Sequence, residues 1–321
     1  MGFPAWVLQN RSIRIVTVPV LGGKIVSLFD LESGQEWLLQ PERPPLVPPK
    51  YGQSFRDYGF FGWDEMFPTI RPCSYPAPGD YYGRLLPDHG EVWALPWQVV
   101  STCQNRLELS VHGRALPYRL TRRLALCGSG KRLRLDYRLT NTGQTPWAGL
   151  WAAHPQLPIF PGDTVHVSPM IETVVNAQTS QRLGSVGQVH TWPSSYDLDQ
   201  RQIHLDRICG DSLHSSRKVY LRPDQSTGEM CLKRSRERNS IYTIADMLTF
   251  AWNPLSLPYL GLWVDEGQFS PQPVVALEPS SGYYDELCLA YQNKRCLFLQ
   301  PGETTAWELT VAITTSCIKK T

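Results

Sequence analysis

The feature that most constrains this chain is a repeated alternation of apolar and polar residues with a period of two. Such alternation is typical of β-strands that bury one face and expose the other. It occurs in residues 12–18, 24–29, 107–111 and 307–313. The clearest unit joins residues 118–126 to 132–139 through Gly128-Ser129-Gly130, with arginines alternating with leucine and tyrosine on both arms. This pattern predicts a β-hairpin.

Helical signals are scarce, because no window keeps an apolar stripe at helical spacing over three turns. The 27 prolines and 24 glycines punctuate the whole chain, which favours many strands and many turns. The predicted fold class is therefore all-β, and 321 residues suit one large antiparallel β-sandwich. We expect residues 1–321 to form a single domain, with a Pro-rich surface loop at 39–54 and long loops over one end of the sheet at 175–240.

Bulk composition argues against several classes of protein. The formal net charge is only +2 and basic residues are spread along the chain, so nucleic acid is not an expected partner. The densest basic cluster, residues 233–238, is interpreted as a solvated loop. No apolar stretch is long enough to span a membrane, and no signal peptide is visible. The eight cysteines lack CxxC spacing, which favours reduced thiols in a cytoplasmic protein and no bound metal or cofactor.

Three short polar islands stand out in apolar, Pro- and Gly-rich surroundings. They are residues 86–90 (Leu-Pro-Asp-His-Gly), 152–155 (Ala-Ala-His-Pro) and 276–279 (Ala-Leu-Glu-Pro). Each lies at a predicted strand end or turn, where a scaffold can direct side chains into a shared cleft. His89, His154 and Glu278 together are a minimal set for moving protons.

The islands belong to a longer ordered set of motifs. The set comprises residues 59–70 (Gly-Phe-Phe-Gly-Trp-Asp-Glu-Met-Phe-Pro-Thr-Ile), 86–97 with its trailing Pro-Trp, 150–155, 258–263 (Pro-Tyr-Leu-Gly-Leu-Trp) and 277–279. In this order the motifs resemble those of the aldose 1-epimerase (galactose mutarotase-like) family. The resemblance covers nearly the whole chain and is weakest across residues 170–245.

The resemblance implies a β-sandwich of the galactose mutarotase type and an activity that interconverts the α and β anomers of a free sugar. By residue match, Glu278 is the general base on the anomeric hydroxyl and His154 the general acid to the ring oxygen. His89 would hydrogen-bond the sugar and the opening ring. We expect the three to converge on one cleft, with Glu278 and His154 on opposite sides of a gap as wide as a pyranose. No metal or organic cofactor is implied.

Three further residues are predicted to bind the substrate. Asp64 and Glu65 are adjacent, so in an extended segment they point to opposite faces and only one can enter the site; we choose Asp64 and expect Glu65 to cap a turn. Trp263 is the best candidate for stacking on a pyranose face. Arg71 lies near the first histidine motif.

The chain also departs from the family pattern, which leaves the sugar open. The sugar-binding aspartate expected between the second histidine and the glutamate has no clear match, because Asp197, Asp199, Asp206 and Asp211 compete for it. The Arg-Gly-Gly motif of the hexose-6-phosphate branch is absent, which favours an unphosphorylated substrate.

Two alternatives to an epimerase stay open at this point. One is a non-catalytic carbohydrate-binding or sensing protein that keeps the cleft without turnover. The other is a glycoside hydrolase or polysaccharide lyase; a hydrolase needs two carboxylates facing one bond, and only Glu278 has a good context. In each case the expected partner is a small-molecule carbohydrate, and the expected state is a monomer or homodimer.

Overall fold

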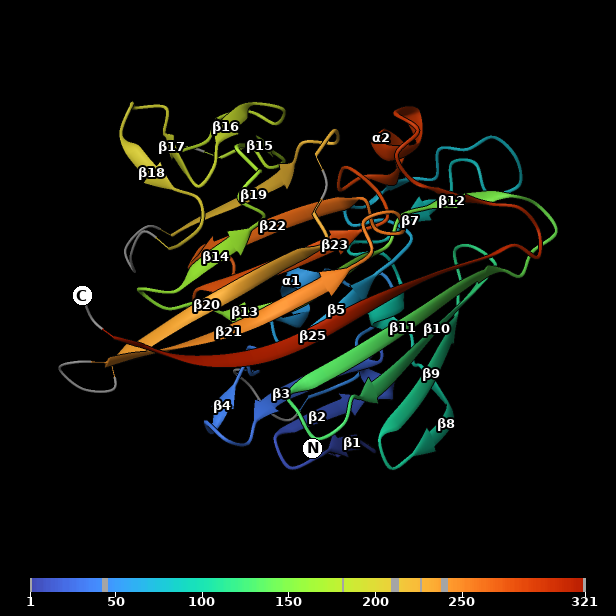
Figure 1. The fold of residues 1–321 in the computed structure, drawn as a ribbon. Helices are drawn as coiled ribbons and strands as arrows, with labels where there is room; N and C mark the ends of the chain where they lie inside the picture. The colour runs from blue at the N-terminus through green and yellow to red at the C-terminus, as the bar shows by residue number, and fades with distance from the viewer. Residues whose placement is uncertain are drawn as a thin grey trace.

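The computed structural model describes residues 2–41, 46–180, 182–208, 214–225, 227–237 and 242–319. The prediction of an all-β protein is confirmed, since two large antiparallel sheets dominate the molecule (Figure 1). The predicted hairpin is present as β10 (Tyr118–Leu126) and β11 (Arg132–Asn141), in register from Tyr118 opposite Asn141 to Leu126 opposite Leu133.

Sheet 1 has eleven strands within the described residues. In spatial order they are β1 (Trp6–Gln9), β2 (Ile13–Val18), β3 (Lys24–Asp30), β5 (Trp63–Met66), β13 (Ala152–Pro158), β23 (Val274–Ser280), β22 (Tyr259–Glu266), β19 (Ser215–Leu221), β15 (Thr173–Asn176) and β16 (Val189–Thr191), with β4 (Gln35–Glu36) paired to β3. Its central strands come from segments far apart in the sequence, so this sheet can bring distant motifs together.

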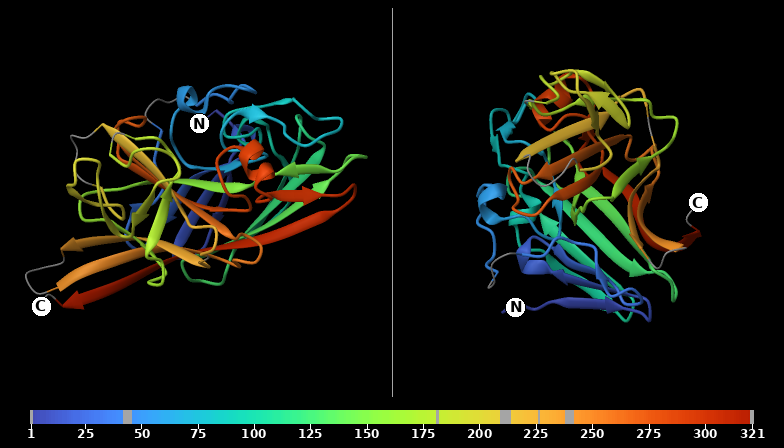
Figure 2. Two further views of the ribbon diagram at one scale, coloured as in Figure 1. Left: turned by 90° about the horizontal axis from the view of Figure 1, so that it is seen from above. Right: turned by 90° about the vertical axis from the view of Figure 1, so that its left-hand side faces the viewer.

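Sheet 2 has eight strands in the described part of the chain. Their order is β14 (Thr164–Val167), β20 (Glu229–Glu237), β21 (Tyr242–Trp252), β25 (Thr304–Lys319), β11, β10, β9 (Arg106–His112) and β8 (Gln98–Cys103). Figure 2 shows its long strands curving along one side of the molecule. Small pairs and short helices complete the fold: β6 (Cys73–Ser74) with β7 (Leu85–Leu86), β12 (Trp147–Gly149) with β24 (Leu297–Leu299), β17 (Ser194–Tyr196) with β18 (Gln202–His204), η1 (Pro19–Leu21), α1 (Phe55–Tyr58), η2 (Val92–Ala94) and α2 (Leu287–Gln292).

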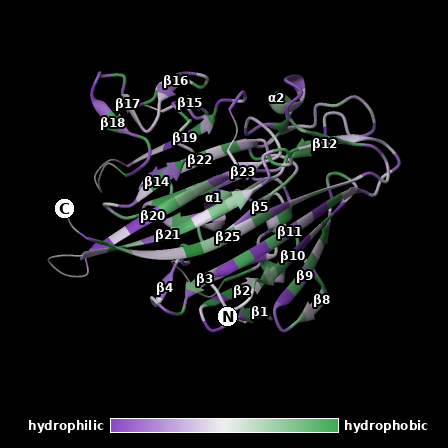
Figure 3. Ribbon diagram, in the orientation of Figure 1, coloured by the Kyte–Doolittle hydropathy of each residue, from purple (hydrophilic) through white to green (hydrophobic). Residues whose placement is uncertain are grey.

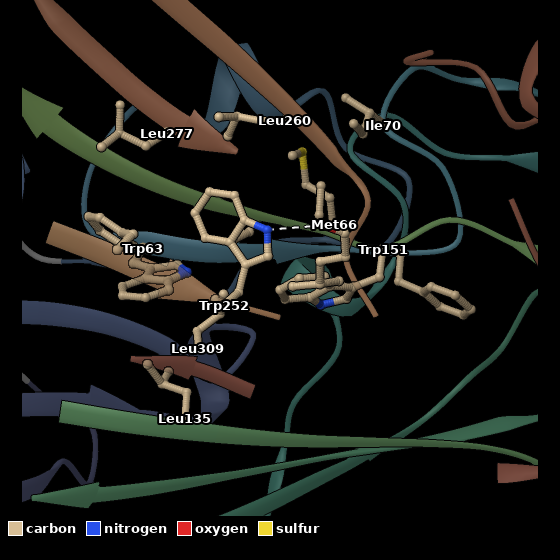
Figure 4. Close-up of a cluster of buried hydrophobic side chains, with 14 of the residues drawn as sticks. Trp63, Met66, Ile70, Leu135, Trp151, Trp252, Leu260, Leu277 and Leu309 are labelled. Carbon is tan, nitrogen blue, oxygen red and sulfur yellow. Dashed lines mark hydrogen bonds between the residues drawn. The ribbon is translucent and has the colours of Figure 1, made fainter. Parts of the chain in front are cut away.

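The main apolar core joins the two sheets. Trp63 and Leu277 of sheet 1 and Leu135 and Leu309 of sheet 2 belong to one buried cluster (Figure 4). The ring of Trp63 lies 5.4 Å from that of Phe250 in β21, which is a contact across the layers. Hydropathy alternates along the strands of both sheets (Figure 3), as the period-two pattern predicts. This continuous core supports the single-domain prediction, which stays a prediction.

Alternation also defines which face of sheet 1 is free for chemistry. In β23, Leu277 belongs to the core between the sheets, so Glu278 points to the other face. In β19, Val219 and Leu221 belong to the core, so Lys218 and Tyr220 share the face of Glu278. We call this the outer face of sheet 1.

For residues 175–240, the expectation of long loops is incomplete and that of a solvated basic loop is wrong. The region is not only loops, because β19 and β20 are integral strands of the two sheets. The basic cluster that begins at Lys233 is not a solvated loop, because residues 233–237 lie in β20, where Arg234 pairs with Asp163 at 3.0 Å. The ion pair lets Arg234 occupy a part-buried place in the strand, and residues 235–237 are exposed, so the apolar pattern that normally reveals a strand is weak here. Arg238 lies outside the described residues.

The helices of the described chain include none that is both long and apolar enough to cross a membrane. Six of the described cysteines are free thiols, namely Cys73, Cys103, Cys127, Cys231, Cys288 and Cys296. The reduced state of the cysteines stays an expectation, and Cys209 lies outside the described residues.

Candidate active site

The second and third polar islands meet on the outer face of sheet 1. Strands β13 and β23 are neighbours, and the pairs Ala152–Ser280 and Gln156–Ala276 flank His154 and Glu278 symmetrically. His154 Nε2 lies 3.9 Å from Glu278 Oε1. Both side chains are almost fully buried, with 3% and 2% of their surface exposed. An imidazole and a carboxylate are therefore held side by side in a low-dielectric environment.

The first polar island reaches the same place through a tight turn. His89 has a positive φ of 58°, and its backbone N–H donates to the carbonyl of Ile70 at 2.6 Å. At Gly90 (φ 68°), a Cβ atom would lie 2.2 Å from the carbonyl oxygen of Phe67, so only glycine permits this close approach. The turn places the ring of His89 5.2 Å from that of His154. The close approach to Phe67 thus explains why glycine follows the histidine in this motif.

His89, His154 and Glu278 therefore lie together, as their motifs predict. One detail is wrong: His154 and Glu278 do not face each other across a gap as wide as a pyranose. They stand on adjacent strands, and adjacent strands are separated by roughly 5 Å, which leaves no room for a ring between their side chains. A sugar would have to lie over the pair rather than between its members.

Asp64 lies beside His154 but has no exposed carboxylate. The two residues are register partners in β5 and β13, and Asp64 is fully buried. Its Oδ2 pairs with the ammonium of Lys24, and Gln156 Nε2 lies 3.2 Å from the same oxygen. Burial raises the pKa of Asp64, against the opposing effect of Lys24. Asp64 thus forms part of the floor of the site, and direct binding of a sugar by this residue is not favoured by its surroundings.

Glu65 points to the opposite face from Asp64, as predicted, but it does not cap a turn. It enters the layer between the sheets, where Glu65 Oε1 accepts hydrogen bonds from Arg122 Nη1 at 2.9 Å and from the Tyr137 hydroxyl at 2.7 Å. The Glu65 and Arg122 side chains are completely buried. A charged group in this layer requires a partner, and the arginine of β10 supplies it.

Trp263 and Arg71 lie at two edges of the site. The ring of Trp263 is 6.1 Å from that of His154 and stacks on Phe60 at 5.5 Å. Arg71 is 45% exposed, and its Nε lies 3.8 Å from Asp285 Oδ2. Their binding roles stay predictions, although Phe60 already occupies one face of the Trp263 indole.

A charged cluster that the sequence did not reveal completes the site. Lys218 Nζ of β19 lies 2.6 Å from Glu278 Oε2 and 2.8 Å from Asp285 Oδ1. The hydroxyl of Tyr220 donates to the same Asp285 oxygen at 2.7 Å. Gly261, between Tyr220 and Glu278 across the sheet, makes room for them, because a Cβ there would lie 3.2 Å from Glu278 Oε2. Lys218 lies in a polar segment without clear alternation, so its sequence context does not indicate that it is buried in a site.

Three of the four aspartates that compete for the sugar-binding role are described, and none of the three belongs to this cluster; Asp199 lies 3.6 Å from Arg201 in an exposed pair. Asp197 accepts backbone hydrogen bonds from Asp199 and Arg201 in its own turn, and Asp206 pairs with Arg207. Asp211 lies outside the described residues. The carboxylate that joins the site is instead Asp285, which follows the glutamate motif.

Burial sets the protonation of the two central groups. It lowers the pKa of His154 well below its usual value, and the positive charges of His89, Lys218 and Lys24 lower it further. It raises the pKa of Glu278, while the ammonium of Lys218 opposes that rise. The imidazole of His154 is therefore neutral near neutral pH in this closed arrangement, not the imidazolium that a general acid requires.

A short segment covers the site. We call residues 46–60, which contain α1, the cover segment. Its Phe55 is fully buried, stacks on His89 with centroids 4.1 Å apart, and meets His154 edge-on at 5.3 Å. Asp88 fixes this contact, because Oδ2 accepts from the Phe55 N–H at 2.9 Å while Oδ1 lies 2.9 Å from His89 Nδ1. Phe55 thus occupies the place over the histidines that a sugar ring would need.

A pocket of about 150 Å³ opens beside the charged cluster. Its lining includes Arg71, Tyr220, Tyr283, Tyr284 and Asp285. Aromatic faces, hydroxyls and a guanidinium are groups that can contact a sugar. In the parts of the chain that are described, no cluster of three or more His, Cys, Asp or Glu residues is arranged to hold a metal.

Sequence comparison finds no match to any family model and no match to a curated protein. Solved structures, in contrast, match along nearly the whole chain. The Slr1438 protein from Synechocystis sp. PCC 6803 has a TM-score of 0.68 at 19% identity, over 98% of this chain and 97% of that chain. A galactose mutarotase related enzyme from Lactobacillus acidophilus has a TM-score of 0.66 at 14% identity, over 97% of both chains.

A galactose mutarotase-like protein from Lactobacillus casei ATCC 334 has a TM-score of 0.63 at 16% identity, over 97% of this chain and 100% of that one. This chain has the galactose mutarotase-like fold. The fold resemblance expected from the ordered motifs is therefore confirmed. A shared fold does not by itself carry an activity, so the function of this galactose mutarotase-like chain must be argued from its site.

Proposed function

We propose that this protein is an aldose 1-epimerase-like isomerase that interconverts the α and β anomers of a free sugar or sugar derivative. The observation that supports the proposal most is the meeting of His89, His154 and Glu278, from three distant segments, at a buried site on a galactose mutarotase-like fold. A base beside an acid is what ring opening requires.

The side-by-side placement suits this reaction. The hydroxyl oxygen O1 and the ring oxygen O5 are both bonded to C1, so the groups that serve them must be neighbours. Glu278 Oε1 would take the proton from O1 as the C1–O5 bond breaks and C1=O1 forms, and His154 Nε2 would give a proton to O5. Rotation about C1–C2 followed by the reverse transfers produces the other anomer. The distance of 3.9 Å between His154 Nε2 and Glu278 Oε1 suits one group that donates a proton to O5 and another that accepts a proton from O1.

Two features of the closed site set conditions on turnover. The sugar must displace Phe55 from its place over the histidines. His154 must also gain a proton, which its burial disfavours. Opening of the cover segment satisfies both conditions, because entry of water reduces the desolvation that holds the imidazole neutral.

The charges around the site favour an uncharged sugar. Lys24 is paired with Asp64, and Lys218 and Arg71 both face Asp285. Each of these cations already has a carboxylate partner, so a sugar phosphate would have to compete for them. This agrees with the absence of the Arg-Gly-Gly motif from the sequence.

The decisive experiment measures exchange between the anomers of free sugars by saturation-transfer NMR. We expect the wild-type protein to accelerate exchange for at least one sugar of a panel, and Glu278→Gln and His154→Asn each to lose on the order of a hundred- to ten-thousand-fold in rate. Glu308→Gln and His166→Asn are matched controls on sheet 2, where both side chains are exposed. Exchange at the uncatalysed rate for every sugar tested would contradict the proposal.

A non-catalytic carbohydrate-binding protein is the second candidate, because Phe55 fills the site and the Glu278 carboxylate is engaged in an ion pair with Lys218 in the closed structure. That function predicts binding of sugars without any acceleration of exchange. A glycoside hydrolase is less favoured, because Glu278 and Asp285 share one ammonium group instead of standing on either side of a bond.

A further inference from the structure

Lys218 lies at the point where two buried carboxylates meet. Its ammonium group is 2.6 Å from Glu278 Oε2 and 2.8 Å from Asp285 Oδ1, and 7% of the side chain is exposed. Burial alone would lower the pKa of Lys218, but Asp285 and Glu278 outweigh that effect and raise it. The positively charged ammonium group of Lys218 thus lies in contact with Glu278, the residue proposed as the base.

The contact distinguishes the two oxygens of Glu278. Oε2 is held by Lys218, whereas Oε1 is directed toward His154 Nε2. A carboxylate that is fixed at one oxygen can rotate little, so the other oxygen keeps a constant direction. That direction is the one in which the proposed reaction needs a base.

Asp285 in turn fixes Lys218. It accepts from the Tyr220 hydroxyl at 2.7 Å and faces Arg71 Nε at 3.8 Å. Burial alone would raise the pKa of Asp285, but Lys218 and Tyr220 hold it below its usual range. The Asp285 carboxylate is therefore ionised and holds the Lys218 ammonium group in place. Any movement of that ammonium group relative to Glu278 would break its ion pair with Asp285.

The charges facing Glu278 come from several elements. Lys218 of β19 and His89 of the 86–90 turn favour its ionised form, and Asp285 and burial oppose it. His154 of β13 is held neutral by burial and therefore contributes little charge. Removal of Lys218 would leave two buried carboxylates, Glu278 and Asp285, without the cation that contacts both of them.

We propose that Lys218, anchored by Asp285, is a positioning residue that keeps Glu278 ionised and turns its Oε1 toward the reacting sugar. The inference rests on the proposed isomerase function for its meaning in catalysis, but the state of the Glu278 carboxylate can be measured without turnover.

The test compares Lys218→Met with Lys218→Arg and with a matched control, Lys131→Met. Lys131 is also a lysine between two carboxylates, Asp30 at 2.8 Å and Glu32 at 3.0 Å, but it lies away from the site. Two readouts are used: the pH dependence of kcat/KM for anomer exchange, and the titration of the Glu278 carboxylate by carbon-13 NMR, assigned by comparison with Glu278→Gln.

We expect Lys218→Met to move both the acidic limb of the rate profile and the carboxylate titration up by at least one pH unit. The rate at neutral pH should fall tenfold or more and recover in part as the pH rises, with the larger change in kcat than in KM. Lys218→Arg should keep both midpoints near those of the wild type, and Lys131→Met should move neither.

An unchanged Glu278 titration in a folded Lys218→Met variant would overturn the inference. If Lys218→Met does not fold, Lys218→Gln replaces it, since this change also removes the ammonium charge beside Glu278 Oε2, and no upward shift of the Glu278 titration there would equally overturn the inference. If the wild-type protein has no turnover, the proposed function fails, yet the carboxylate titration still decides whether Lys218 holds Glu278 ionised.

Discussion

Replacement of Phe55 by alanine tests whether the cover segment controls access to the site. The ring is fully buried against His89 and His154, and burial of a phenylalanine side chain contributes about 1.5–3 kcal/mol. The closed state of the variant should lose about that much relative to the open state. Because about 1.4 kcal/mol changes an equilibrium constant tenfold, the equilibrium constant for opening of the cover segment should rise about 10- to 150-fold.

The expected result is a lower KM for sugars, by up to the same factor, because the binding-competent state is more populated. The pKa of His154 should also rise toward its ordinary value as water enters, which a titration of its ring protons by NMR would detect. Phe29→Ala, in β3 and away from the histidines, is the control and should leave both quantities unchanged.

An increase in KM with no rise in the pKa of His154 would refute this reasoning. It would mean that Phe55 contributes to binding and does not compete with the sugar. The thermal stability of the variant must be measured in parallel, so that a globally unfolded protein is not mistaken for an open one.

Two further predictions concern stability. Because the pKa of His154 is lowered in the folded state, the unfolded chain takes up a proton below about pH 6.5 that the folded chain refuses, so stability falls as the pH falls. The difference in unfolding free energy between wild type and His154→Asn, from urea titrations, should change by about 1.4 kcal/mol between pH 7.5 and 5.5, and a constant difference would contradict the burial argument. Arg122→Met should cost about 3–5 kcal/mol, because it leaves the Glu65 carboxylate buried without its cation. The neighbouring Arg123→Met, on the exposed side of β10, should cost no more than about 1 kcal/mol, and equal losses for the two variants would show that burial is not the cause.

The sequence predicted the fold class and the meeting of the three motifs for identifiable reasons. Period-two alternation marks strands that are buried on one face, such as β10 and β11, and these are placed correctly. The turn at His89 and Gly90 was marked by residue types that tolerate a positive φ. Patterns of this kind can be recognised in the sequence because the local backbone conformation of the strand or turn itself requires those residue types.

The sequence could not predict the partners that folding brings in from elsewhere. Lys218 lies in a strand without clear alternation, because its charge is satisfied by Glu278 and Asp285 and not by solvent. The sequence favours Asp64 as a substrate ligand because no local feature reveals that Lys24 pairs with its carboxylate. Phe55 had no motif at all, and its position over the histidines is a property of the tertiary structure.

The central claim is that Glu278 and His154 exchange protons with a sugar bound over them. Its most direct test is the rate of anomer exchange, measured by saturation-transfer NMR for wild type, Glu278→Gln and the double variant with His154→Asn, on a sugar that the protein binds. We expect accelerated exchange in the wild type and a steep loss of rate in Glu278→Gln with modest loss of sugar binding. The double variant should lose less rate than the product of the two single losses. A sugar that binds with exchange at the uncatalysed rate, or a Glu278→Gln variant as fast as the wild type, would contradict it.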